Sequence, residues 1–325
     1  MKVLIVGTGV IGSLYGCALS ENHRVFHYVR PEKASFLDRK EITFDLIDER
    51  QDKKHRNTTG CYTYHCVTDA RGGYDLILVP VKTFQLTETL QTLAEQAPDA
   101  NYVLMTLDWN LSDEFDSILG KSRYILGYAG GGGTFRGNQL WANLGNDIML
   151  GAIHEEQGKL LDKAVDLFKS CGIIPKIEEN PLHWLWIHNV GSAPLGAALT
   201  KYRDINRLLQ DKRLVKTSFK AMRECYSICK KRGVDLTKYG EVKMMSLPAF
   251  LLYPMFRLNF TKNPVMKRYT AHAVDSIDEM VQNFREIYET GSLLGVDMPN
   301  MRILMELVPP VAMSNTIRSV PTAPS

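Results

Sequence analysis

The stretch MKVLIVGTGVIG, residues 1–12, is the part of the sequence that decides the fold. Its apolar run Val3–Val6 predicts a buried strand, which leads directly into a G-x-G-x-x-G motif formed by Gly7, Gly9 and Gly12. A helix-like run follows at once, and a motif placed between strand and helix is a far more specific sign of a dinucleotide site than glycines alone. The first glycine allows a sharp bend, the second lets the backbone approach a pyrophosphate, and the third lets helix and strand pack closely.

The helix that follows this turn offers unpaired N–H groups and a positive dipole end to phosphates. A glycine-rich turn without any ligand is the alternative interpretation. The residues predicted to bind the cofactor here are Gly7, Thr8, Gly9, Val10, Ile11 and Gly12.

Length and composition are typical of a globular protein with two domains. The chain has 325 residues, of which 45% are hydrophobic and 23% charged. A formal net charge of +3 gives no electrostatic reason to expect a nucleic-acid partner. No run approaches the roughly 18 apolar residues of a membrane span, and the start of the chain lacks signal-peptide architecture. We therefore expect a cytoplasmic protein without a membrane partner. The six cysteines lack zinc-finger spacing, so no metal site is predicted.

The second predicted strand, Arg24–Val29, indicates which dinucleotide is bound. NAD enzymes usually place an acidic residue at the end of this strand to hold the ribose 2′-hydroxyl. No acid occupies positions 26–30, and Arg30 follows the strand instead. A guanidinium suits a 2′-phosphate because it is always charged and presents several donors. NADP(H) is therefore favoured over NAD(H), with Arg30 as an ordinary solvated residue the alternative.

Further apolar strands predict a continuing α/β pattern. The run Asp75–Val81 is expected to be a central parallel strand that delivers Lys82 at its carboxyl end, where residues line the ligand crevice. Asp108 follows the strand at 102–107, and it either binds the cofactor or caps the turn that follows. Gly130–Gly133 predicts a flexible loop or a close approach of backbone.

From His183 onward helical periodicity dominates, with long stretches at 184–199, 208–232 and 271–294. We predict an α/β fold in which an N-terminal Rossmann-type doubly wound sheet, residues 1–180, is followed by an all-helical C-terminal domain, residues 181–312. A flexible tail is expected at 313–325, and a site in the cleft between the domains. The apolar run Phe250–Tyr253 is compatible with a homodimer contact or a substrate lid.

Ordered motifs along residues 1–305 resemble the ketopantoate reductase (2-dehydropantoate 2-reductase) family. The motifs are the glycine turn, Arg30, Val79–Gln85, Leu126–Gly127, Asn189 before Ala193–Leu195, Asp278–Met280 and Leu294–Pro299. The resemblance implies reduction of the 2-dehydropantoate ketone with NADPH, on the route to pantothenate. It also implies that Lys82 contacts the cofactor and substrate region, that Asn189 binds substrate, and that Glu279 grips a substrate hydroxyl.

The chain departs from this family at three positions. Leu185 stands where the family has its essential lysine, Trp109 falls on the position of an asparagine, and Ala193 replaces another asparagine. Leucine cannot donate a proton to a developing alkoxide, so another residue must do so.

Two polar residues on the same helix face as Leu185 could replace the missing lysine. His188 and Asn189 lie three and four residues after Leu185 and share its face. We predict His188 as the acid, because histidine titrates near neutral pH, and a core histidine beside Trp184 and Trp186 is the alternative interpretation.

The predicted function is reduction of a 2-oxo acid by NADP(H), with 2-dehydropantoate or a related keto acid as the small-molecule substrate. Lys82, His188, Asn189 and Glu279 are the predicted catalytic residues, and Lys82, Arg30 and Asp108 add to the cofactor site. Two other functions remain open: an NADP(H)-binding sensor without turnover, and a reductase for a different keto acid.

Overall fold

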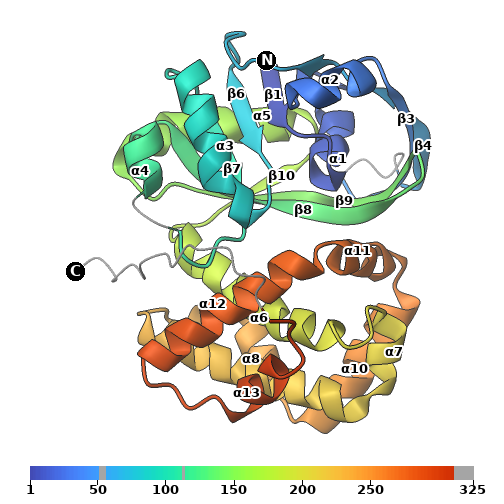
Figure 1. Ribbon diagram of the computed structural model, residues 1–325, viewed down its shortest axis with the longest axis vertical. Coiled ribbons are helices and arrows are strands. Elements are labelled where there is room, and N and C mark those ends of the chain that lie inside the picture. The colour runs from blue at the N-terminus through green and yellow to red at the C-terminus, as the bar shows by residue number, and fades with distance from the viewer. Residues whose placement is uncertain (51–55, 112–113, 311–325) are drawn as a thin grey trace. The chain divides into compact units, whose positions relative to one another are not determined.

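The computed structural model describes residues 1–50, 56–111 and 114–310 (Figure 1). The chain forms two compact units. Of the described residues, the sheet unit contains 1–106 and 114–181. The main part of the helical unit begins at Leu182. A short segment that starts at Leu107 also belongs to the helical unit, although the sequence analysis placed it in the first domain. The tail predicted at 313–325 lies outside the described residues.

The sheet unit contains one mixed sheet of ten strands among the residues described. The strands are β1 (Lys2–Val6), β2 (Arg24–Tyr28), β3 (Glu41–Asp48), β4 (Thr58–Thr63), β5 (Cys66–Val67), β6 (Leu76–Val79), β7 (Tyr102–Met105), β8 (Tyr124–Arg136), β9 (Gln139–Gly151) and β10 (Ile174–Ile177). They lie in the order β4-β3-β9-β8-β7-β6-β1-β2-β5, with β10 beside β9. Neighbours from β5 to β8 in this order are all parallel, which confirms the predicted Rossmann-type sheet.

The central strands are apolar on both faces because helices cover both sides of a parallel sheet. Val3, Leu4 and Ile5 of β1 are completely buried. The helices of this unit are α1 (Val10–Leu19), α2 (Pro31–Leu37), α3 (Thr83–Gln96), α4 (Glu114–Leu119) and α5 (Gly158–Ser170). Both α1 and α5 pack against β8 and β9, while α3 and α4 pack against each other (Figure 1). The sheet reverses its strand order at β1, where the chain continues to β2 on one side and β6 on the other, and such a reversal marks the ligand site of an α/β sheet.

The glycine run Gly130–Gly133 lies inside β8 and is not a flexible loop, which corrects one of the two predictions for it. β8 pairs antiparallel with β9, and the register shifts between Ala129 and Gly131. A Cβ on Gly130 would lie 2.0 Å from the carbonyl oxygen of Asp147. The other prediction, close approach of backbone, is therefore confirmed: the bulge leaves no room for side chains.

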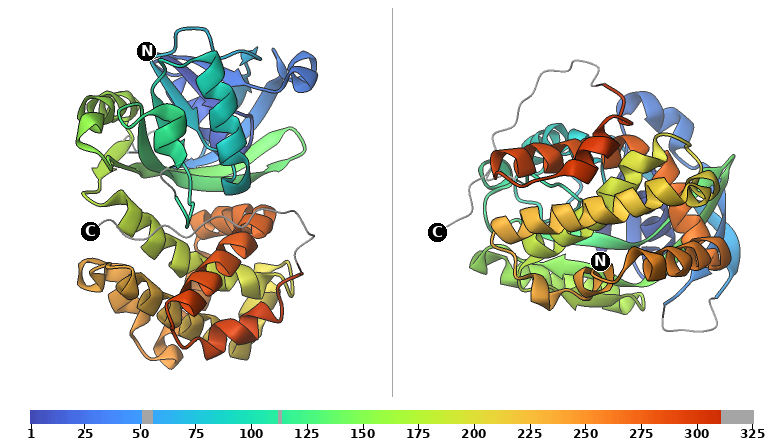
Figure 2. Two further views of the ribbon diagram at one scale, coloured as in Figure 1. Left: turned by 60° about the vertical axis from the view of Figure 1, so that its left-hand side comes forward. Right: turned by 90° about the horizontal axis from the view of Figure 1, so that it is seen from below.

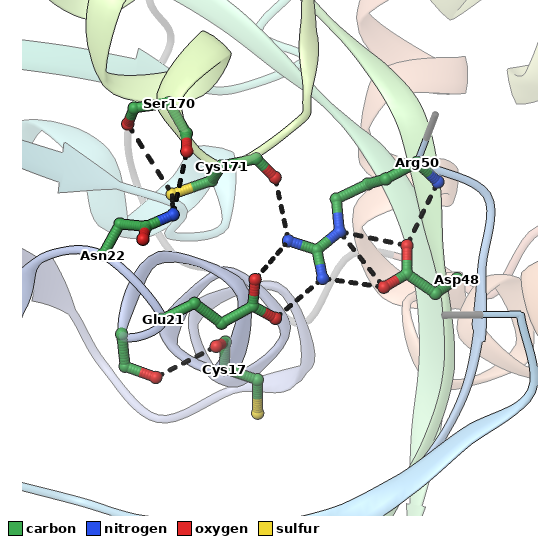
Figure 3. A network of polar contacts seen from close by, with 8 residues as sticks. Cys17, Glu21, Asn22, Asp48, Arg50, Ser170 and Cys171 are labelled. Carbon is green, nitrogen blue, oxygen red and sulfur yellow. Dashed lines mark hydrogen bonds and ion pairs between the residues drawn. The ribbon is translucent and has the colours of Figure 1, made fainter. Parts of the chain in front are cut away.

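A buried arginine joins three distant segments of the sheet unit (Figure 3). The Arg50 guanidinium donates to both carboxylate oxygens of Asp48, at 2.7 to 3.1 Å, and to both oxygens of Glu21, at 2.8 and 3.0 Å. It also donates to the carbonyl oxygen of Cys171 at 2.9 Å. The end of β3, the end of α1 and the turn after α5 are thus held by one side chain.

The helical unit is built around α8 (Lys212–Lys231), which packs against α7, α10, α12 and α13 (Figure 2). The other helices are α6 (Pro181–Leu199), α7 (Ile205–Gln210), α9 (Gly240–Met245), α10 (Ala249–Lys262), α11 (Pro264–Asp275), α12 (Ile277–Leu293) and α13 (Pro299–Met305). None of the helices in the described residues is long and apolar enough to span a membrane.

Two helical stretches predicted as continuous are divided in the structure. The stretch at 208–232 breaks at Asp211, because its carboxylate accepts a hydrogen bond from the Leu214 N–H and starts α8. The stretch at 271–294 breaks at Ser276, between α11 and α12. Within Phe250–Tyr253, the first two residues are exposed and the last two are buried in the core of the helical unit. A homodimer contact through this run stays a prediction.

Candidate cofactor and substrate sites

The glycine turn between β1 and α1 has the geometry of a phosphate cradle. Gly7 has φ +85°, which favours glycine. A Cβ on Gly12 would lie 2.8 Å from the Gly7 carbonyl oxygen, so only glycine lets α1 approach the turn this closely. Gly9 is the N-cap of α1 and faces open space, with no described side chain capping the helix. The first N–H groups of the helix are therefore available to an anion.

The end of β2 lies directly beside this turn. The Gly7 N–H donates to the Tyr28 carbonyl oxygen at 2.8 Å. Arg30 is the N-cap of α2 two residues further on, and its side chain is exposed. The segment that selects between ribose substituents in this fold thus ends in an accessible cation.

Lys82 follows β6, the strand that pairs with β1 on the side away from β2. It is the N-cap of α3 and is partly buried, with its Nζ 5.7 Å from the centre of the Phe84 ring. No carboxylate of the described residues forms an ion pair with it. The sheet unit therefore brings Lys82, Arg30 and the glycine turn to the carboxyl ends of three adjacent strands.

Asp108 caps the turn after β7, which was one of its two predicted roles. It is buried, and its Oδ1 accepts a hydrogen bond from the Asn110 N–H at 2.9 Å. This arrangement is typical of an Asp that stabilises a turn. A contact between Asp108 and a cofactor stays a prediction.

Two buried asparagines of the helical unit converge on one backbone carbonyl. Asn189 of α6 donates to the Leu107 carbonyl oxygen at 2.9 Å, and Asn283 of α12 donates to the same oxygen at 3.3 Å. The Oδ1 atoms of both side chains are buried and have no hydrogen-bond partner among the described residues. A buried amide oxygen without a partner is costly unless a ligand or water supplies a donor. Asn283 was not foreseen from the sequence, because nothing in its helical spacing distinguishes it.

His188 stacks on the Trp184 ring, with ring centres 4.9 Å apart and planes 6° from parallel. Burial lowers the pKa of His188 to about 4. The imidazole is therefore neutral at pH 7, and the acid role of His188 stays a prediction. A neutral ring can still donate one hydrogen bond.

The three positions expected to depart from the family pattern lie in packed surroundings. Leu185, Ala193 and Trp109 are all at most 1% exposed. Trp109 donates from Nε1 to the Thr290 hydroxyl at 2.9 Å and belongs to the core of the helical unit. The Arg232 guanidinium lies 4.5 Å from the Trp109 ring centre and 3.5 Å from that of Trp186. The Trp109 side chain thus anchors the segment after β7 in the helical unit.

Glu279 lies in the first turn of α12 and is partly buried. The positive end of the helix dipole stabilises a carboxylate there. The described residues hold no group of three His, Cys, Asp or Glu side chains arranged for a metal ion.

A buried histidine that sequence reasoning missed lies behind the glycine turn. His27 of β2 is completely buried, with Nδ1 2.8 Å from the Gly7 carbonyl oxygen and Nε2 2.8 Å from the Tyr62 hydroxyl. Burial lowers its pKa to about 4, although the hydrogen bond to Gly7 opposes this. Only its alternation in β2 could have indicated burial.

We expect His27 to make the protein less stable in acid. The unfolded chain takes up a proton near pH 6.5 and the folded chain only near pH 4, so the free energy of unfolding falls by about 3 kcal/mol across that range. Above pH 6.5 both states are neutral and this contribution is constant. Urea unfolding at several pH values measures this dependence. His27→Gln should flatten the slope of the unfolding free energy against pH. His65→Gln, at an exposed histidine whose charge adds only a minor part of the His27 shift, should flatten it far less. An equal slope in wild type and His27→Gln contradicts the expectation.

Known proteins share both the sequence pattern and the fold. A family model described as Ketopantoate reductase PanE/ApbA matches residues 3–152. A 2-dehydropantoate 2-reductase of Pyrococcus abyssi is 24% identical over 249 residues, which cover 72% of this chain and 76% of that protein. The solved 2-dehydropantoate 2-reductase of Geobacter metallireducens GS-15 superposes with a TM-score of 0.70 at 18% identity, over 95% of this chain and 99% of that one.

A solved D-mandelate dehydrogenase, in a ternary complex with NADH and anilino(oxo)acetate, superposes with a TM-score of 0.68 at 15% identity. The superposition covers 95% of this chain and 97% of the dehydrogenase chain. The fold and the glycine turn define a Rossmann-type sheet unit that is followed by a helical unit. The chain resembles the ketopantoate reductase family of oxidoreductases, as the sequence motifs predicted.

Proposed function

We propose that the protein reduces the ketone of a 2-oxo acid, 2-dehydropantoate or a related compound, with NADPH. The observation that carries the proposal is the glycine turn with its open N-cap at Gly9. This turn follows β1, the strand that pairs with β6, and Lys82 follows β6. A phosphate cradle beside a cation that forms no ion pair with a described carboxylate suits a reaction in which negative charge develops on an oxygen.

NADPH, held by the glycine turn and Arg30, would supply a hydride to the keto carbon. The electron pair of the C=O bond then moves to oxygen, which takes a proton to give the 2-hydroxy acid. Lys82 is the positively charged donor that stabilises the developing alkoxide and delivers this proton. Asn189 binds substrate through the amide oxygen that lacks a partner, and Glu279 accepts from a substrate hydroxyl. His188, neutral at pH 7, is assigned a hydrogen bond without proton transfer.

Arg30 is proposed to select NADPH by pairing with the 2′-phosphate. Arg30→Ala should raise the Kd for NADPH about tenfold or more and leave the Kd for NADH unchanged, because a hydrogen bond to a charged group contributes about 1.5–3 kcal/mol. Fluorescence titration of both nucleotides measures the two constants. Arg24→Ala is the matched control, an exposed arginine at the opposite end of β2. An equal loss of affinity for NADPH and NADH would instead assign Arg30 a general structural role.

The substrate class is tested by turnover. The wild-type protein is incubated with NADPH or NADH and each of three 2-oxo acids: 2-dehydropantoate, pyruvate and phenylglyoxylate. The absorbance of the reduced nicotinamide is followed. Oxidation with any of them supports the reductase, and the preferred acid identifies its class. The phenyl-bearing acid is included because the fold is shared with D-mandelate dehydrogenase.

One observation favours a second function, binding of NADP(H) without turnover. Leu185 is buried where the related family has its essential lysine, so this position supplies no proton. Tight NADPH binding with no oxidation across the panel supports a sensor or regulatory module. Absence of nucleotide binding contradicts both functions.

A further inference from the structure

Two carbonyl groups of the glycine turn are held from behind by side chains of the sheet unit. His27 contacts the Gly7 carbonyl oxygen at 2.8 Å. Ser13 of α1 donates from its hydroxyl to the Thr8 carbonyl oxygen at 3.1 Å. Both side chains are completely buried.

Each of these side chains is in turn oriented by a tyrosine. A carbonyl only accepts, so Nδ1 of His27 carries the proton, and Nε2 of the neutral ring accepts from the Tyr62 hydroxyl at 2.8 Å. Ser13 already donates to Thr8, so it accepts from the Tyr64 hydroxyl at 2.6 Å. The result is two parallel relays, Tyr62–His27–Gly7 and Tyr64–Ser13–Thr8.

The relays lie in a rigid aromatic cluster. The His27 ring packs edge-to-face with Tyr62 and Tyr64, at centre distances of 5.8 and 5.0 Å, and the two tyrosines pack edge-to-face with each other at 5.5 Å. A Cβ on Gly16 of α1 would lie 2.8 Å from both the His27 Nε2 and the Tyr62 hydroxyl. The helix therefore closes over the relay only because residue 16 has no side chain.

The direction of the held carbonyls determines where the N–H groups point. In a planar trans peptide the C=O of one residue and the N–H of the next point in opposite directions. Holding the Gly7 and Thr8 carbonyls toward the buried cluster turns the N–H groups of Thr8 and Gly9 the other way, where Gly9 faces open space. Successive N–H groups arranged in this way form a concave anion site.

We propose that Tyr62–His27 and Tyr64–Ser13 are positioning residues that preorganise the turn for the pyrophosphate of the cofactor. This inference rests on the proposed function, since it assumes that the turn binds a dinucleotide. The four side chains touch no ligand. They act by removing the freedom of two peptide groups before the cofactor arrives, which lowers the entropic cost of binding.

The test compares single hydroxyl deletions. Tyr62→Phe and Tyr64→Phe should each raise the Kd for NADPH about fivefold to tenfold, the factor expected for one hydrogen bond, with kcat unchanged at saturating NADPH. Tyr15→Phe is the matched control: Tyr15 is a buried tyrosine of α1 whose hydroxyl accepts from the Gly130 N–H, and it is not one of the four relay residues. Unfolding by urea shows whether the three variants lose similar stability.

Rescue at residue 27 adds a second readout. His27→Gln keeps a donor for the Gly7 carbonyl and should bind NADPH more tightly than His27→Phe. The relay is wrong if wild type binds NADPH but Tyr62→Phe and Tyr64→Phe both bind it with the same Kd as Tyr15→Phe. A wild-type protein that binds neither NADPH nor NADH overturns the proposed function and the relay together.

Discussion

Lys82→Met should lower kcat for the preferred 2-oxo acid by about 10²–10³, the loss seen when one donor to a developing oxyanion is removed. Lys82 combines three features that support this expectation. It follows β6, which pairs directly with β1, it is only partly buried, and it forms no ion pair with a carboxylate of the described residues. A cation of this kind is available to an oxygen on which charge develops, whereas a paired lysine is not.

Lys40→Met is the matched control for Lys82→Met. Lys40 also lies over an aromatic ring of the sheet unit, with its Nζ 4.6 Å from the centre of Phe36, but it does not follow a central strand. Its removal should leave kcat unchanged. Steady-state kinetics with saturating NADPH measures kcat for both variants. A Lys82→Met protein with wild-type kcat would remove Lys82 from the chemistry and leave the proton donor to be found elsewhere.

Arg50→Ala should lower the free energy of unfolding by about 3–5 kcal/mol, because it leaves a buried carboxylate without its partner. Asp48 and Arg50 are only 2% and 8% exposed. The same substitution also removes the link to Glu21 and to the carbonyl of Cys171 (Figure 3). The effect should be large even though the residue lies outside the proposed site.

Urea unfolding measures this effect, and two variants make the measurement specific. Arg71→Ala removes an arginine that pairs with Asp69 on the surface, where ion pairs contribute little, so its stability should stay near that of wild type. Adding Asp48→Asn to Arg50→Ala removes the orphaned charge and should recover part of the loss. Wild-type stability in Arg50→Ala contradicts a stabilising role for the cluster.

Local sequence patterns predicted the strand, turn and helix at the start of the sheet unit well. The glycine spacing, the apolar strand before it and the helix after it are short-range features, and each is confirmed by the turn between β1 and α1. The position of Lys82 after β6 followed from the same reasoning, since a buried parallel strand delivers its next residue to the ligand edge of the sheet. Such patterns are informative because backbone geometry sets their period.

Sequence patterns gave wrong predictions where the structure of a local motif depends on residues far away in the sequence. Four glycines at 130–133 indicate a loop when read alone, but their lack of side chains serves a bulge against β9. The segment after β7 was assigned to the first domain, yet Trp109 is buried in the helical unit. The acid role of His188 stays a prediction, and burial lowers the pKa of this histidine.

The sequence by itself determined that this chain carries a strand–glycine turn–helix unit, an arginine after the second strand and a lysine after the sheet's central strand. Those features depend only on neighbouring residues and on backbone geometry. Only the tertiary structure decided that Tyr62 and Tyr64 stand behind the turn, and that Asn189 and Asn283 meet at Leu107. The partners in these contacts are 35 to 176 residues apart, and side-chain contacts over such separations follow from packing, which leaves no periodic trace in the sequence.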